Sequence, residues 1–392
     1  MINIIHHSAV ISNTLDKNGF NFFTPCVKRN LIRCIQAFFS KSFNGKTVDM
    51  ARSSNIHRTT AAHFLNKGKW DDALLQDAIK ATVIENIYEH SKRTGKPIYC
   101  IIDDTISSKT KPSSQAVHPM EAAFFHQSHL KRRQDYGHQA VVVMLACDNI
   151  ILNYATCMYD KSQSKIEMIT KIADELPIPP CGGYLLCDSW YTAKNLIEAF
   201  AVHGFHTIGA IKTNRVIYPC GIHQQVKDFA ALLSKDDSNI KLLKIGNRKY
   251  YVYRYDGDVN GIHGITVIIS YPENAFGNPK ALRVFLSTDS NLSTEEILNT
   301  YTHRWPIEVF FRETKGTLSM DKYQIRSATG IKRYWLIISL VYLLCCIGTD
   351  KITSFNEGYK FYCEKICIEK IEFIKMANNN GMTMESLAAM VA

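Results

Sequence analysis

The 392-residue chain has the composition of an ordinary globular protein with a surplus of positive charge. Hydrophobic residues make up 46% and charged residues 21%, which suffices for a sizeable core and excludes a disordered, low-complexity chain. Lys and Arg exceed Asp and Glu by a formal +10 at pH 7. This balance suits a polyanionic partner, because neutralising phosphates releases condensed counterions.

Neither the cysteines nor the apolar segments indicate a secreted or membrane protein. The twelve cysteines include no second Cys or His pair at zinc-finger spacing, and they are interpreted as reduced thiols of a cytosolic protein. The most apolar stretch, Tyr334 to Gly348, is shorter than the ~20 residues that span a bilayer. It is expected to be a buried core helix.

Residues 1–94 are predicted to be helical and basic. They hold 13 Lys and Arg against 7 Asp and Glu. Within them, residues 47–70 resemble a helix-turn-helix, in which Arg58, Thr59 and His63 of the second helix would point toward DNA. An ordinary helical hairpin explains the same pattern, so both interpretations stay open.

The pattern changes to strands after the breaker cluster Thr94-Gly95-Lys96-Pro97. Three strands are predicted first, and helices and strands then alternate. The predicted strands are 98–103, 140–147, 150–158, 184–187 and 206–211, and the predicted helices are 165–176 and 193–203. Three strands followed by helix, strand, helix and strand is the order of an RNase H-like core, which we assign to residues 95–212.

Strand-like segments separated by Gly-rich turns interrupt this alternation at residues 213–280, which are predicted to be an all-β insertion. The core resumes at 281–348, where Pro306 should kink or restart a helix over 293–315. Residues 349–392 are expected to form a C-terminal helical tail. The expected fold class is therefore α/β: an RNase H-like mixed sheet flanked by helices, with an all-β insertion and an N-terminal helical DNA-binding region.

Acidic residues follow two of the apolar runs that are predicted to be buried strands. Asp103 and Asp104 close the first run, and Asp188 closes the run Leu185–Cys187. Phosphodiester cleavage by two metal ions needs a few carboxylate ligands around ions about 4 Å apart. A buried strand fixes the direction of such ligands, but an acid at a strand end is also a common turn former.

A more specific pattern lies in the segment YTHRWPIEVFFRETK, residues 301–315. Its spacing is Tyr-x2-Arg-x3-Glu-x6-Lys, formed by Tyr301, Arg304, Glu308 and Lys315. In the helix after the proline, Glu308 and Lys315 share one face. An acid in this position can hold a metal ion while the neighbouring basic residues grip phosphates.

This segment resembles the Y-R-E-K box of DDE insertion-sequence transposases, and the string Tyr-Thr-His-Arg-Trp-x-Ile-Glu is similar to it nearly letter for letter. The resemblance covers roughly residues 98–345. It implies a DNA transposase that binds terminal inverted repeats and carries out metal-dependent strand cleavage and strand transfer. By the family pattern, the catalytic and metal-binding triad is Asp104, Asp188 and Glu308, with Asp103 as the alternative first ligand.

The same resemblance implies the ligands and partners. Two Mg²⁺ or Mn²⁺ ions would bind in each active site, and Tyr301, Arg304 and Lys315 would contact phosphates around the cleaved end. The partner would be double-stranded DNA, both transposon ends and target, held by a homodimer in the synaptic complex and located in the bacterial cytoplasm at the nucleoid. Two alternatives fit parts of the sequence: a non-catalytic helix-turn-helix DNA-binding regulator, and a stand-alone RNase H-like nuclease that hydrolyses without joining.

Overall fold

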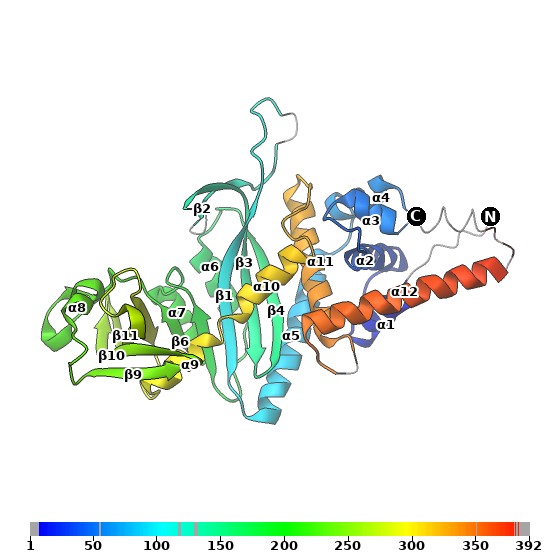
Figure 1. Ribbon diagram of the computed structural model, residues 1–392. Coiled ribbons are helices and arrows are strands. Elements are labelled where there is room, and N and C mark those ends of the chain that lie inside the picture. Colours follow the sequence, from blue (N-terminus) through cyan, green and yellow to red (C-terminus); the bar gives the residue numbers. More distant parts are fainter. Residues whose placement is uncertain are drawn as a thin grey trace.

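The computed structural model describes residues 8–54, 56–116, 119–128, 132–349, 351–379, 381 and 383. Figure 1 shows an elongated molecule: helices α1 to α4 and α12 lie at one end, a sheet lies in the middle, and a β-rich part lies at the other end. Asn55 in the predicted helix-turn-helix and residues 384–392 of the expected tail lie outside the described residues.

The N-terminal part is built from helices. They are α1 (Ala9–Lys17), α2 (Pro25–Phe38), α3 (Thr47–Ser53), α4 (Arg58–Asn66) and α5 (Asp72–Thr94). α3 and α4 pack against each other, so the predicted pair of helices is present. Three apolar residues of α4 are buried, whereas Arg58, Thr59 and His63 are exposed. Gly95 ends α5 in the left-handed conformation (φ 69°), as suits the breaker cluster.

The central sheet is mixed. Its strands are β1 (Ile98–Ser108), β2 (Phe124–Ser128), β3 (Arg133–Cys147), β4 (Ile150–Tyr159), β5 (Gly183–Cys187), β6 (Phe205–Ala210) and β12 (Arg283–Ser287). β3 pairs antiparallel with β1, β2 and β4, whereas β5 and β6 continue the sheet parallel to β1. Parallel neighbours need crossover connections, which α6 (Lys165–Ala173) and α7 (Lys194–Val202) supply.

Residues 213–280 extend the sheet but are not purely β. They contain β7 (Val216–Ile217), β8 (Gln224–Gln225), β9 (Ile240–Ile245), β10 (Arg248–Val259) and β11 (Ile262–Pro272), the 3₁₀ turns η1 (Pro219–Gly221) and η2 (Glu273–Ala275), and the helix α8 (Val226–Leu232). The prediction of an all-β insertion is wrong here because Val226, Phe229 and Ala230 repeat at helical spacing. β11 pairs with β12 and β12 pairs with β6, so the sheet is continuous.

The last four described helices cover the sheet and the N-terminal part. They are α9 (Thr294–Thr302), α10 (Pro306–Gly316), α11 (Ala328–Ile347) and α12 (Phe355–Asn379). Ser293 and Glu296 form a capping box at the start of α9. Pro306 begins α10, so the expected helix over 293–315 is divided in two at this proline.

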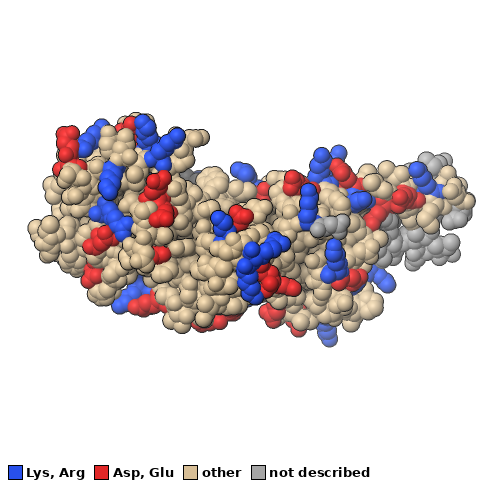
Figure 2. Space-filling view, turned by 90° about the horizontal axis from the view of Figure 1, so that it is seen from below, with Lys and Arg blue, Asp and Glu red and all other residues tan. Residues whose placement is uncertain are grey.

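Charged side chains of both signs are mixed on the surface shown in Figure 2. Lys and Arg lie beside Asp and Glu over much of that face. The net charge of +10 is therefore not gathered into a single basic surface there.

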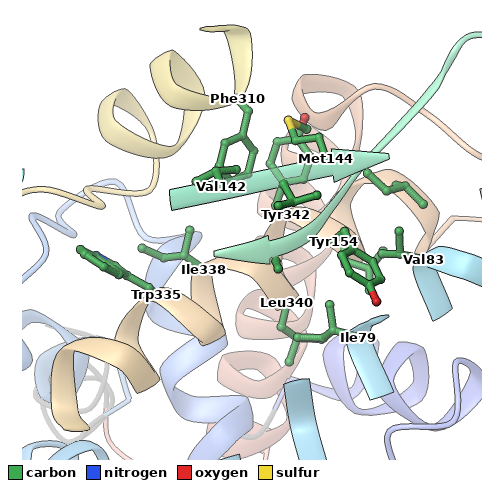
Figure 3. Packing of buried hydrophobic residues seen from close by; sticks show 14 of the residues in the cluster. Ile79, Val83, Val142, Met144, Tyr154, Phe310, Trp335, Ile338, Leu340 and Tyr342 are labelled. Carbon is green, nitrogen blue, oxygen red and sulfur yellow. The ribbon is translucent and has the colours of Figure 1, made fainter. Parts of the chain in front are cut away.

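α11 is the centre of the larger hydrophobic core. Figure 3 shows Ile338 and Leu340 of this helix close to Val142 of β3 and Ile79 of α5. Among the described helices, α11 alone is long and apolar enough to cross a membrane, but 89% of its most apolar window is buried inside the protein. The prediction of a core helix in this region is confirmed.

Candidate active site

β1 carries the two neighbouring acids within the strand rather than at its end. The strand was expected to stop at Asp103, but it continues to Ser108 by pairing with β3. Successive side chains of a strand point to opposite faces of the sheet. Asp103 and Asp104 therefore face opposite sides.

The face of β1 that carries Asp103 is covered by α10. Arg304, between α9 and α10, donates from Nη1 to Asp103 Oδ2 and from Nη2 to Glu308 Oε1, each at 2.9 Å. Two residues further along β1, Thr105 Oγ1 accepts from Lys315 Nζ at 2.5 Å. α10 therefore runs along β1, with Glu308 near Asp103 and Lys315 near Thr105.

Asp188 lies next to Asp103 because β5 is the parallel neighbour of β1. Ile102 pairs with Cys187, so the residues that follow on the two strands are Asp103 and Asp188. Burial above all, and also the negative charge of Asp188, raise the pKa of Asp103 to about 7, although Arg304 acts in the opposite direction. The structure thus brings three acids, Asp103, Asp188 and Glu308, to one face.

Asp104 lies among different partners on the other face. Its Oδ2 accepts from the Tyr191 hydroxyl at 2.8 Å and from Lys165 Nζ at 2.7 Å, and its Oδ1 accepts from Gln139 Nε2 at 2.5 Å. The expectation that Asp104 lies with Glu308 is therefore wrong. A displacement by one residue along a strand reverses the face of the sheet. Asp103, the alternative first ligand, lies on the face that carries Glu308.

Carboxylate oxygens of this kind are donors that Mg²⁺ and Mn²⁺ prefer. Within the described ranges, no three Asp, Glu, His or Cys side chains lie close enough together to hold one metal ion. Instead, the Arg304 guanidinium supplies positive charge between Asp103 and Glu308. The three acids fit a divalent cation in donor type, and added positive charge would favour the ionised form of Asp103, whose pKa burial raises.

The other residues of the Y-R-E-K spacing lie on the same face. The Tyr301 ring packs 4.7 Å from the Phe285 ring and 5.9 Å from the Arg304 guanidinium. Burial raises the pKa of Tyr301 to about 12, so its hydroxyl keeps a proton to donate. Arg304 thus contacts Glu308, Tyr301 lies beside Arg304 and Lys315 contacts β1. α4, which carries the exposed Arg58, Thr59 and His63, lies elsewhere on the molecule (Figure 1).

The partners of Asp104 could not be identified from the sequence. Gln139, Lys165 and Tyr191 come from β3, α6 and the loop after β5. No motif or fixed spacing joins them, because their meeting depends on the pairing of strands that are distant in the sequence. The position of Tyr191, three residues after Asp188, is the one local signal.

Two comparisons with known proteins find similar sequences. The family described as Transposase DDE domain matches residues 94–344, a range that contains the three acids. The putative transposase for insertion sequence element IS4SA from Synechocystis sp. is 28% identical over 136 residues, which cover 33% of this chain and 39% of that protein. The similarity to this relative thus spans about two fifths of its length. Because the family match extends over well more than half of the chain, the chain belongs to the Transposase DDE domain family.

Proposed function

We propose that this protein is a DNA transposase that binds the terminal inverted repeats of an insertion sequence and catalyses metal-dependent strand cleavage and strand transfer. Asp103, Asp188 and Glu308 are its catalytic acids. The observation that carries this proposal is the bridge through Arg304, which bonds to Asp103 and Glu308 at 2.9 Å each. Membership of the family gives the class of reaction.

The order of the strands supports an RNase H-like core. β4, β3 and β1 are antiparallel neighbours, and β5 and β6 follow in parallel to β1. This is the order expected of such a core, in which acids on two parallel neighbours lie side by side.

In DNA cleavage, the acidic side chains of this face would bind metal ions and the others would contact DNA. The three acids would hold two Mg²⁺ or Mn²⁺ ions. When bound, such ions activate the attacking water or 3′-hydroxyl and stabilise the leaving oxygen. Arg304 and Lys315 would place positive charge beside the phosphates around the cleaved end, and Tyr301 would donate a hydrogen bond to them.

The exposed residues Arg58, Thr59 and His63 on α4 would contact the terminal repeats as part of a helix-turn-helix. Inverted repeats present one sequence twice in opposite orientations. Two protein copies related by a twofold axis suit this arrangement, so we propose a homodimer that also takes up target DNA. Its DNA substrate would place the protein in the bacterial cytoplasm, at the nucleoid.

Substitutions on α10 test the proposal. We expect Glu308→Gln to abolish Mg²⁺-dependent nicking of DNA that carries the element's ends, while end binding in a gel-shift assay stays unchanged. Glu313→Gln is the matched control on the same helix, because Glu313 bonds to Asn356 at 3.0 Å instead of to the site. Cleavage by the Glu308→Gln variant at the control's rate would contradict the proposed active site.

Assays of end binding, nicking and strand transfer with the wild-type protein distinguish the transposase from the two alternative functions. End binding without any metal-dependent nicking would indicate a non-catalytic regulator. Nicking without transfer of 3′-hydroxyl ends into a target plasmid would indicate a stand-alone nuclease. Transfer of these ends supports a transposase.

A further inference from the structure

A second group of polar side chains lies behind the active face. We call Asp104, Gln139, Lys165 and Tyr191 the Asp104 cluster. Gln139 belongs to β3, Lys165 is the first residue of α6, and Tyr191 lies in the loop after β5. The carboxylate of Asp104, the residue after Asp103, thus connects β3, α6 and the loop after β5 to β1.

The Asp104 carboxylate is satisfied within the protein. It accepts one hydrogen bond at Oδ1 and two at Oδ2. Tyr191 is 1% exposed, and the side chains of Lys165 and Asp104 are 11% and 19% exposed. A largely buried carboxylate that has a cation and two neutral donors is suited to holding elements together rather than to receiving a ligand.

The turn over residues 188–191 connects this cluster to the active face. Asp188 Oδ1 accepts from the Trp190 amide at 2.9 Å, and its carbonyl accepts from the Tyr191 amide at 3.2 Å. Lys165 Nζ lies 4.5 Å from the centre of the Trp190 ring, and the Trp190 and Tyr191 rings are 4.9 Å apart. The cluster therefore contacts the last two residues of a turn that begins with a catalytic acid.

We infer that Asp104 is a positioning residue: with Lys165 and Tyr191, it holds the 188–191 turn against β1 and so fixes Asp188 beside Asp103. The inference rests on the proposed function, because it concerns support for the metal-binding acids. Residues that hydrogen-bond near metal ligands orient those ligands. Substituting such a residue lowers the affinity for the metal, although the ligands themselves are still present.

Two substitutions weaken the cluster without touching the three acids. Tyr191→Phe removes one hydrogen bond, and Lys165→Met removes the cation. Lys80→Met is the matched control. Lys80 Nζ lies 2.6 Å from a carboxylate of Glu175 and 5.6 Å from a tyrosine ring, and its side chain is 13% exposed; for Lys165 the corresponding values are 2.7 Å, 5.5 Å and 11%.

The first readout is hydrogen exchange of the full-length, metal-free protein, measured by mass spectrometry. We expect residues 188–193 to exchange about ten-fold faster in Tyr191→Phe and Lys165→Met and unchanged in Lys80→Met, because local opening becomes easier. Unchanged exchange in this segment would overturn the inference, and so would an increase spread over the whole sheet. This readout does not depend on catalysis.

The second readout is the Mg²⁺ dependence of DNA nicking. The same two variants, and also Asp104→Asn, should need about ten-fold more Mg²⁺ for half-maximal rate while their rate at saturating Mg²⁺ stays near that of the wild type. If Asp104→Asn is inactive at every Mg²⁺ concentration, as Asp103→Asn should be, Asp104 is itself a ligand and the inference fails. If the wild type does not nick DNA, the proposed function fails, and the exchange result still decides whether the cluster holds the turn.

Discussion

Asp103 destabilises the metal-free fold wherever its carboxyl group is ionised. Its pKa is raised from 3.8 to about 7 in the folded protein, so the folded state binds this proton more tightly than the unfolded chain. Stability is therefore lost as the pH rises from about 4 to 7. Asp103→Asn removes this titration, and we expect it to raise the free energy of unfolding by about 4 kcal/mol at pH 8 and to leave it unchanged at pH 4. Chemical denaturation in EDTA measures both values.

Asp104→Asn provides the contrast. It removes the partner of Lys165, which lies 2.7 Å away, and should lower stability at pH 8. If Asp103→Asn also lowers stability at pH 8, the ion pair with Arg304 outweighs the burial of Asp103, and the assigned pKa direction is wrong.

The sequence predicted that the first acidic pair and the segment 301–315 lie together, as the bond between Asp103 and Arg304 shows, but it did not decide between Asp103 and Asp104. Arg304, just before α10, and Glu308, in its first turn, are four residues apart, so their proximity is local information. Asp103 and Asp104 differ only in the face that they occupy. That face depends on how far β1 extends and on its register with β3, which residues distant in the sequence decide.

Among the elements, α11 is hydrogen-bonded to the link between α4 and α5. Arg333 donates to the carbonyl oxygens of Gly68 and Trp70 at 2.8 and 3.0 Å and to Asp72 at 2.9 Å. We expect Arg333→Met to lower the free energy of unfolding by about 2 kcal/mol, because buried acceptors lose their donor. Trypsin should also cleave the link between α4 and α5, at Lys67 or Lys69, faster than in the wild type.

Lys332→Met is the control for this prediction. Lys332 is the preceding residue, half-exposed, and lies 4.0 Å from its nearest carboxylate, so its loss should alter neither stability nor cleavage. Equal digestion of the link in both variants would show that other contacts hold α4 to the core.

Long apolar or amphipathic segments were the elements that the sequence predicted well. β3, β4 and α11 each contain a run of buried residues, and such runs carry their own signal. β2 and the second half of β1 were not predicted. In residues 104–108 of β1, apolar and polar side chains do not alternate regularly, so the sequence gives no strand signal there. Both segments are strands because β3 is long enough to pair with both, which is a tertiary cause.

At the scale of the whole molecule, the parts proposed for DNA recognition and for catalysis are separate. α3 and α4 lie at one end in Figure 1, and α10 crosses the central sheet. Acidic and basic side chains are mixed on the face in Figure 2, so net charge does not mark out a DNA-binding surface on that face. We therefore expect individual exposed cations such as Arg58 on α4 to contribute to end binding.

Arg58→Ala tests this separation. Removing one phosphate contact should weaken end binding and reduce the slope of log affinity against log salt by about 1. The rate of cleavage at saturating DNA should remain that of the wild type, because Arg58 lies on α4 and the three acids lie on the central sheet and α10. Glu308→Gln should show the reverse pattern, with normal binding and no cleavage.

Lys92→Ala is the matched control, since Lys92 is an exposed cation of α5 that pairs with Glu89 at 2.7 Å, and its loss should leave both affinity and salt slope unchanged. If Arg58→Ala binds like this control, α3 and α4 are an ordinary helical hairpin and the terminal repeats are recognised elsewhere. If Arg58→Ala instead binds normally but cleaves slowly, α4 acts on the catalytic step, and recognition and catalysis are coupled rather than separate.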